Sequence, residues 1–225
     1  MKRIIIAILL VIMAIPVADA ARKRKKAGKV KDYVYTDAIY NFKLTLNEGW
    51  KYKVQKEKET SRLILSKVDY GIPPEYQSAP DYTKIPRMVV AVVETNMSAV
   101  EFIDSLASES FDSDQKKELT KEFEILNVLG GSGFTPEDLI VRGRGGYEVN
   151  GVRGGEWEGE VRYTNEVAVS ASSIGGKRVK GSYGGYIVAL KKDNTLVLFH
   201  MICEYNYFDE IKQATEKIIN TLKFE

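Results

Sequence analysis

The glycines of this chain are concentrated in one stretch, which limits the structures that the stretch can form. Fifteen of the eighteen glycines lie between residues 130 and 185, where they are interleaved with aromatic residues and valines. Glycine destabilises the interior of a helix and is favoured in turns and at close backbone contacts. The pair Asn150-Gly151 is a strong signal for a hairpin turn. We therefore expect glycine-rich β-hairpins here.

Residues 156–163 predict one strand of these hairpins. Its apolar residues share one face, and Glu156, Glu158 and Glu160 share the other at two-residue spacing. We interpret the glutamate face as solvated, with its charge balanced by the basic segment 177–180. The alternative is a calcium site, provided that other oxygen atoms converge on it.

Alternating apolar and polar residues predict further strands in the rest of the chain. The expected elements are a hairpin formed by residues 40–46 and 50–54, strands at 62–68 and 87–93, and a second hairpin formed by 186–190 and 196–202. Both faces of residues 196–202 are apolar, so we place this strand in the centre of a sheet.

Two helices are expected, far apart in the sequence. Ser98 and Glu101 match a capping box at the start of the first, and Asn206 can cap the second. Helical spacing of apolar residues in the second predicts a buried face made of Phe208, Ile211, Thr215, Ile218 and Leu222. Many strands and few, separated helices indicate an α+β domain in which helices pack on an antiparallel sheet.

The composition excludes several kinds of chemistry. The 225 residues contain one Cys and one His, so neither an intramolecular disulfide, a cysteine zinc cluster nor a multi-histidine metal site can form. His200 and Cys203 lie on opposite faces of one predicted strand, and we interpret both as buried structural residues. We predict no catalytic residue, metal or cofactor, and we expect that the protein is not an enzyme.

Residues 1–20 have the three parts of a Sec-type signal peptide. Two basic residues precede an uninterrupted apolar run at 4–17, and Ala18-Asp19-Ala20 provides a cleavage site before Ala21. We therefore expect a periplasmic or extracellular protein that is soluble after cleavage. The alternative is an uncleaved N-terminal anchor, because positive charge directly after an apolar run opposes translocation.

Charge divides the remaining chain into an arm and a body. Residues 21–31 hold seven Lys or Arg and no acid, whereas residues 32–225 hold 24 bases and 30 acids. We expect the arm to be flexible and the body to be a single domain. The arm residues Arg22, Lys23, Arg24, Lys25 and Lys26 are candidates for binding anionic lipid or cell-wall polymer; the alternative is a solvated leader. The export signal and the acidic body disfavour nucleic acid as a partner.

A loop between the third and fourth predicted strands is the best candidate for contact with a partner protein. It contains Tyr70, Pro73, Pro74, Tyr76 and Tyr82. Tyrosine and proline provide contact area at a low entropic cost of ordering. The alternative is a loop that folds down over a sheet edge.

The two ends of the body resemble the PsbP-like family. The match covers residues 40–50, which run from an aromatic residue through alternating apolar positions into Gly49-Trp50, and residues 186–224, which contain the last strands and helix. The resemblance implies an α/β/α sandwich with a central, mainly antiparallel sheet, here with a glycine-rich hairpin insertion. It also implies a non-catalytic exported protein that binds partner proteins.

These observations leave three hypotheses for function. The first is an exported, non-enzymatic protein-interaction or scaffold module of unknown partner. The second is an envelope-surface protein tethered to anionic lipid or polymer by the basic arm. The third is a hydrolase in which Glu156, Glu158 or Glu160 provide the acid and the base.

Overall fold

The computed structural model describes residues 25–67, 86–107, 134–167 and 177–225. Within these ranges, side chains are described except at 105–107, 134–139, 161–167 and 177–181. The helices in the described ranges are too short and too polar to cross a membrane.

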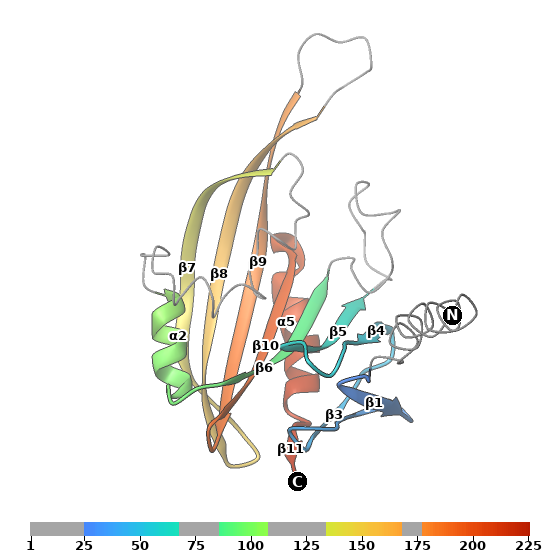
Figure 1. Ribbon diagram of the computed structural model, residues 1–225. Coiled ribbons are helices and arrows are strands. Elements are labelled where there is room, and N and C mark those ends of the chain that lie inside the picture. Colours follow the sequence, from blue (N-terminus) through green and yellow to red (C-terminus); the bar gives the residue numbers. More distant parts are fainter. Residues whose placement is uncertain (1–24, 68–85, 108–133, 168–176) are drawn as a thin grey trace, which may run out of the picture.

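Seven antiparallel strands form the larger of two sheets (Figure 1). In chain order they are β4 (Trp50–Val54), β5 (Ser61–Lys67), β6 (Arg87–Glu94), β7 (Phe134–Val149), β8 (Val152–Val167), β9 (Lys177–Lys192) and β10 (Thr195–Glu204). Their order in space is β4-β5-β6-β10-β9-β8-β7. The predicted hairpin of β9 and β10 and the central place of β10 are therefore confirmed.

The remaining strands form a second, four-stranded sheet. They are β1 (Gly28–Lys31), β2 (Val34–Asp37), β3 (Phe42–Thr45) and β11 (Lys223–Phe224), in that order across the sheet. The hairpin predicted from residues 40–46 and 50–54 is wrong, because β3 pairs with β2 and β11 while β4 pairs with β5. The turn between β3 and β4, in which Gly49 has φ 81°, instead leads the chain from one sheet to the other.

Two helices pack on opposite faces of the large sheet. Val188 of β9 belongs to the core cluster that contains the apolar side of α5 (Phe208–Ile219), and the small sheet closes the same cluster. Ile187, which precedes Val188 in β9, belongs to the cluster that contains α2 (Ala99–Ala107). Because neighbouring strand residues point to opposite faces, the two helices lie on opposite sides.

The predicted helix starts have different outcomes. Ser98 and Glu101 form the capping box: the N–H of Ser98 donates to Glu101 Oε2 at 2.7 Å, and the N–H of Glu101 donates to Ser98 Oγ at 3.1 Å. The cap predicted at Asn206 is wrong, because that residue lies in a 3-10 turn, η3 (Tyr205–Tyr207), and α5 follows without a side-chain cap. All five residues predicted on the inner face of the last helix are buried, but α5 ends at Ile219 and Leu222 lies beyond it.

The glycine-rich hairpins are confirmed. β7 and β8 are joined at Asn150 and Gly151, whose φ angles of 50° and 78° suit a tight hairpin turn. Further along β8, a Cβ at Gly154 would lie 2.1 Å from a carbonyl oxygen of β9, and a Cβ at Gly159 would lie 2.0 Å from the Trp157 ring. These two glycines are therefore required by close packing inside the molecule.

A buried ion pair joins the two sheets. The guanidinium of Arg62 on β5 donates to both carboxylate oxygens of Asp37 on β2, at 2.8 and 3.3 Å. Its other N–H groups donate to the backbone carbonyls of Ala27, Glu57 and Glu59. Both charged side chains are at most 2% exposed. Each donor of the guanidinium thus has a partner, as a buried charge requires.

Residues 25–31 correct the prediction of a flexible arm, because they form part of the fold. β1 pairs with β2, and Ala27 is fully buried with its carbonyl bonded to the Arg62 guanidinium. Lys29 and Lys31 alternate with inward-facing neighbours and stay exposed. The β1 backbone is hydrogen-bonded to β2, and the lysine side chains remain solvated. Repulsion between these like charges therefore does not prevent strand formation. The first part of the arm lies outside the described residues.

The predicted fold class is confirmed as a mixture of helices and mainly antiparallel sheet. The finer prediction, an α/β/α sandwich, stays a prediction. The four-stranded sheet is an addition that the sequence did not indicate.

Candidate binding surfaces

The predicted interaction loop lies outside the described residues and stays a prediction. Its residues are Tyr70, Pro73, Pro74, Tyr76 and Tyr82. Three residues of the candidate anionic-surface site, Arg22, Lys23 and Arg24, also lie outside the described ranges. Lys25 and Lys26 are described and exposed, directly before β1.

The single histidine and the single cysteine are buried in β10, as predicted. His200 is 2% exposed, and burial together with the charge of Arg87 lowers its pKa to about 3. Cys203 is fully buried, and burial raises the pKa of its thiol. The histidine is therefore neutral and the thiol protonated at neutral pH, and neither reaches a ligand from solvent.

The three glutamates of β8 correct the prediction of a solvated face. Helix α5 covers this side of the sheet, so Glu160 is 4% exposed and Glu156 and Glu158 are half-buried. Their described partners are the Tyr186 hydroxyl for Glu156, Lys212 for Glu158 and Arg142 for Glu160. The basic segment 177–180 instead pairs with residues 164–167. Within the described ranges, no group of three His, Cys, Asp or Glu residues is arranged to hold a metal ion.

Tyr186 and Lys212 form the centre of this contact between β9 and α5. The Tyr186 hydroxyl donates to Glu156 at 2.7 Å and lies 3.2 Å from Glu216, while Lys212 Nζ lies 4.8 Å from the centre of the Tyr186 ring. Burial and then the bond to Glu156 raise the pKa of Tyr186. Burial alone would lower the pKa of Lys212, but its pairing with Glu158 raises it overall. Both groups keep their protons near neutral pH, which suits structural roles and not acid–base catalysis.

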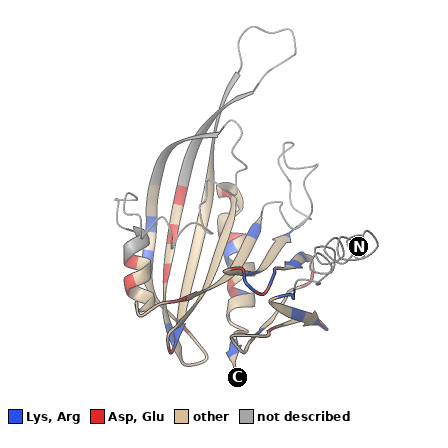
Figure 2. Ribbon diagram, viewed as in Figure 1, with Lys and Arg blue, Asp and Glu red and all other residues tan. Residues whose placement is uncertain are grey.

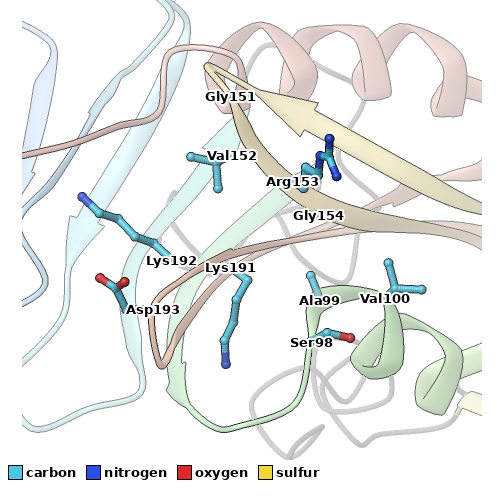
Figure 3. Close-up of a pocket in the computed structure, with 10 residues that line it drawn as sticks. All are labelled: Ser98, Ala99, Val100, Gly151, Val152, Arg153, Gly154, Lys191, Lys192 and Asp193. Atoms are coloured by element: carbon cyan, nitrogen blue, oxygen red, sulfur yellow. The ribbon is translucent and has the colours of Figure 1, made fainter.

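An open cleft of about 540 Å³ lies where the start of α2 meets the β7–β8 and β9–β10 turns (Figure 3). Three basic residues line it, but their side chains point in different directions in Figure 3. Lys191 donates to the carbonyls of the β6–α2 connection, including Met97 at 2.9 Å, and Lys192 Nζ lies 5.0 Å from the Phe224 ring centre. The third, Arg153, is exposed. The charges do not gather around one point, so we assign no ligand to the cleft.

Strand β7 forms one edge of the large sheet. Among the described strands, its sixteen residues pair with β8 only. Two bulges interrupt the ladder in the first half of β7, and the register is regular over residues 143–149. The exposed residues there are Arg144, Gly145, Gly146 and Glu148. Such an edge presents backbone N–H and C=O groups that can pair with another chain.

The glycines of this edge differ from those inside the hairpins. A Cβ at Gly146 would meet nothing within 4 Å, and at Gly143 and Gly145 the nearest atoms would be glutamate carboxylates 3.8 to 3.9 Å away. At Gly154, in contrast, a Cβ would collide with backbone. Internal packing therefore does not explain the edge glycines. Glycine in a strand often marks a place where another backbone approaches closely.

The outer face of the four-stranded sheet carries basic residues by strand register, and Figure 2 marks the Lys and Arg positions along the ribbon in blue. Strand register places Lys29, Thr36, Lys43 and Lys223 in one row across the four strands. Lys31 lies on the same face as Lys29, two residues further along β1. Lys29, Lys31 and Lys223 are exposed, and the side chain of Lys43 is 42% exposed beside Glu225. We call these four lysines the basic face.

Comparison with known proteins places this fold beside a few solved structures. Neither a protein-family model nor a curated protein matches the chain. The solution structure of cyanobacterial PsbP (CyanoP) from Synechocystis sp. PCC 6803 is similar, with 10% identity over 88% of this chain and 96% of that chain and a TM-score of 0.44. This structure is of a PsbP protein, the family that residues 40–50 and 186–224 resemble.

Two further structures are similar. The Ran-binding protein Mog1p from Saccharomyces cerevisiae is 7% identical over 82% of this chain and 90% of that chain, with a TM-score of 0.37. PA94 from Pseudomonas aeruginosa, a protein of unknown function and putative regulator by its description, is 6% identical over 89% of this chain and 98% of that chain, with a TM-score of 0.29. We take neither residue roles nor partners from these similarities.

Proposed function

We propose that this protein is an exported, non-enzymatic interaction module that binds an extended segment of a partner protein along the edge of β7. One observation carries the proposal: residues 143–149 form a regular, exposed edge whose glycines leave open space. A partner strand would continue the antiparallel ladder there, because its backbone would pair with N–H and C=O groups that no described strand pairs.

The cost of the edge glycines supports this use of β7. Glycine in a strand interior costs roughly 0.5 to 1 kcal/mol relative to alanine. Gly143, Gly145 and Gly146 carry this cost although a side chain would fit at each position. Without side chains of their own, they let side chains of a bound strand lie close to β7. Glu148 and Arg144, whose guanidinium also contacts Asp104 of α2 at 3.1 Å, carry opposite charges beside them that can select the partner's sequence.

The non-enzymatic part of the proposal rests on the state of the described titratable groups. His200 and Cys203 are buried, and Glu156, Glu158 and Glu160 are engaged by residues of β7, β9 and α5. A carboxylate pair for hydrolysis needs one raised and one ordinary pKa in an accessible cleft. The described cleft is lined by other residues, so we do not propose the hydrolase.

The experiment that tests the β7 edge is site-specific photocrosslinking in the exporting cell. A photoreactive residue at position 148, which is exposed on β7, should link to a partner chain. The same residue at Val100, 51% exposed on α2, should not yield that product. The parent protein for both is the full chain with its export signal.

A charged edge provides the decisive variant. Gly145→Lys combined with Gly146→Lys should reduce the product from position 148 about tenfold or more, because lysines on an edge oppose strand addition. Both side chains have room, so the thermal unfolding midpoint should stay nearly unchanged. The matched control is Val100→Lys, which should keep the product. An undiminished product in the double-lysine protein would show that the edge is not the docking site.

A second candidate function is attachment to an anionic envelope surface. The basic face of the small sheet favours it, and so do Lys25 and Lys26, which are exposed just before β1.

A further inference from the structure

We propose that the basic face, formed by Lys29, Lys31, Lys43 and Lys223, binds the surface of an anionic lipid membrane. This rests on the second candidate function and deepens it by naming the residues and the lipid surface. It is independent of the interaction module, because it uses a different sheet and residues that take no part in the β7 edge. It also differs from a tether made by the N-terminal arm alone, since Lys43 and Lys223 come from distant parts of the chain.

The fold holds the four lysines in a fixed array. Tyr35, Phe42 and Leu44 on the opposite face of the sheet are fully buried, so the lysines must face outward. Neighbouring strands lie about 4.8 Å apart, which spreads the row across the full width of the sheet. Lysines of such an array can all approach a plane at once, whereas a groove would be needed to enclose a single polymer chain. A flat array therefore fits a lipid surface.

The surrounding charge strengthens this face. Residues 25–45, which contain the first three strands of this sheet, hold five Lys and two Asp. One of those acids, Asp37, faces inward and is neutralised by Arg62. Glu225 contacts Lys43, but both side chains are about half exposed, and such pairs are largely screened. The attraction to anionic lipid consequently exceeds what the overall charge of +2 indicates.

Two features favour a membrane over a soluble polyanion. Tyr33, which follows Lys31 and Asp32 in the β1–β2 turn, is 55% exposed, and tyrosine is enriched where proteins meet the lipid headgroups. In the sequence, the basic segment that leads into β1 directly follows the apolar run at 4–17. β1 is therefore the strand nearest to the predicted export signal in the sequence.

The test measures binding of the protein, as recovered from the exporting cell, to sedimented vesicles. The vesicles contain phosphatidylglycerol and phosphatidylcholine, and phosphatidylcholine alone serves as the neutral surface. Lys29→Gln, Lys43→Gln and Lys223→Gln are combined in one variant. Each lysine near an anionic surface contributes up to about fivefold, so we expect the variant to lose about tenfold or more in partition. High salt should weaken binding of the parent protein.

The matched control removes three exposed lysines elsewhere, Lys51→Gln, Lys58→Gln and Lys217→Gln. It changes the net charge equally and should lose less than about twofold. A second variant combines Lys29→Arg, Lys43→Arg and Lys223→Arg, which keeps the charges and should keep vesicle binding. If the glutamine variant is less stable than the parent, loss of vesicle binding by the arginine variant would contradict the proposal.

Three results would overturn the proposal. The row and control variants could lose binding equally, which would mean that net charge alone acts. The row variant could bind the anionic vesicles as well as the parent does. In a separate assay with soluble polyphosphate, the row variant could lose binding to polyphosphate while its vesicle binding stays unchanged. None of these results bears on the β7 crosslink, so failure of one proposal is distinguishable from failure of the other.

Discussion

The two faces of the four-stranded sheet use charge in opposite ways. On the inner side, Arg62 and Asp37 are at most 2% exposed, and the guanidinium has a partner for each of its donors. On the outer side, Lys43 and Glu225 form an ion pair with side chains that are 42% and 52% exposed. The inner charges hold the two sheets together, and the outer charges remain open to solvent.

The difference follows from the environment of each charge. Burial would raise the pKa of Asp37, but its bond to Arg62 and the N–H groups of Tyr40 and Ile39 hold it below its usual value. A buried charge that loses its partner is left unsolvated, whereas an exposed one returns to water. Inner charges are therefore tied to folding, and outer charges can be used for binding at little cost in stability.

The largest effect expected is that of Arg62→Ala, which breaks the inner pair. Asp37 would stay buried without its counter-charge, so the free energy of unfolding should fall by about 3 to 5 kcal/mol in urea titrations. The bond that secures Ala27 would be lost as well. As a control, Arg62→Met with Asp37→Asn should recover part of the loss. A change below about 1 kcal/mol for Arg62→Ala would show that the buried pair contributes no more than an exposed one.

The same inner and outer distinction applies to the glycines of the long hairpins. Gly154→Ala places a Cβ 2.1 Å from the backbone oxygen of Ala189 and should cost about 2 to 3 kcal/mol. Gly146→Ala, on the open edge, should change stability by less than about 1 kcal/mol and can raise it. Thermal and urea unfolding of both variants measures the difference. Equal effects would refute the division of the glycines into two classes.

Burial of His200 makes the free energy of unfolding depend on pH. Its pKa is lowered to about 3 in the folded protein, by burial and by Arg87, whereas an unfolded histidine titrates near 6.5. Between these two pKa values the unfolded chain binds more protons than the folded protein. The contribution of His200 to the free energy of unfolding is therefore highest above pH 6.5, where His200 is neutral in both states, and it decreases as the pH falls. The loss from pH 7 to pH 5 should be about 2 kcal/mol.

Urea titrations across this pH range measure the slope. His200→Gln should flatten it, even if that variant is less stable at every pH. A slope that persists in the variant would assign the pH dependence to other groups.

Local patterns predicted most elements of the large sheet, because alternation and turn signals act over a few residues. β5, β6, β9 and β10 were found in this way, and Asn150-Gly151 identified the β7–β8 turn. Strand partners were harder to predict. The turn at Gly49 resembles a hairpin turn, but Phe42–Thr45 pairs with Lys223–Phe224 from the other end of the chain.

The candidate surfaces depend even more on distant contacts. Lys29 and Lys31 alternate with smaller, inward-facing residues, and this alternation is typical of a strand although it lies within a run of basic residues. Nothing near Lys43 or Lys223 indicated that they would join the same row. The glutamates of β8 alternate as a solvated face would, yet α5 covers them, because helix placement is set by the packing of the whole core. Spacing alone does not separate these cases.

The smallest stability effect expected is that of Lys43→Gln, which breaks the outer pair. Lys43 and Glu225 are about half exposed, so the free energy of unfolding should change by no more than about 0.5 kcal/mol. The same substitution should weaken binding to phosphatidylglycerol vesicles by up to about fivefold, since the charge lies within the basic face. Urea titration and vesicle sedimentation on one protein preparation give both values. A cost above about 1 kcal/mol would mean that the outer charges also hold the sheet together, and the separation of folding and binding between its two faces would fail.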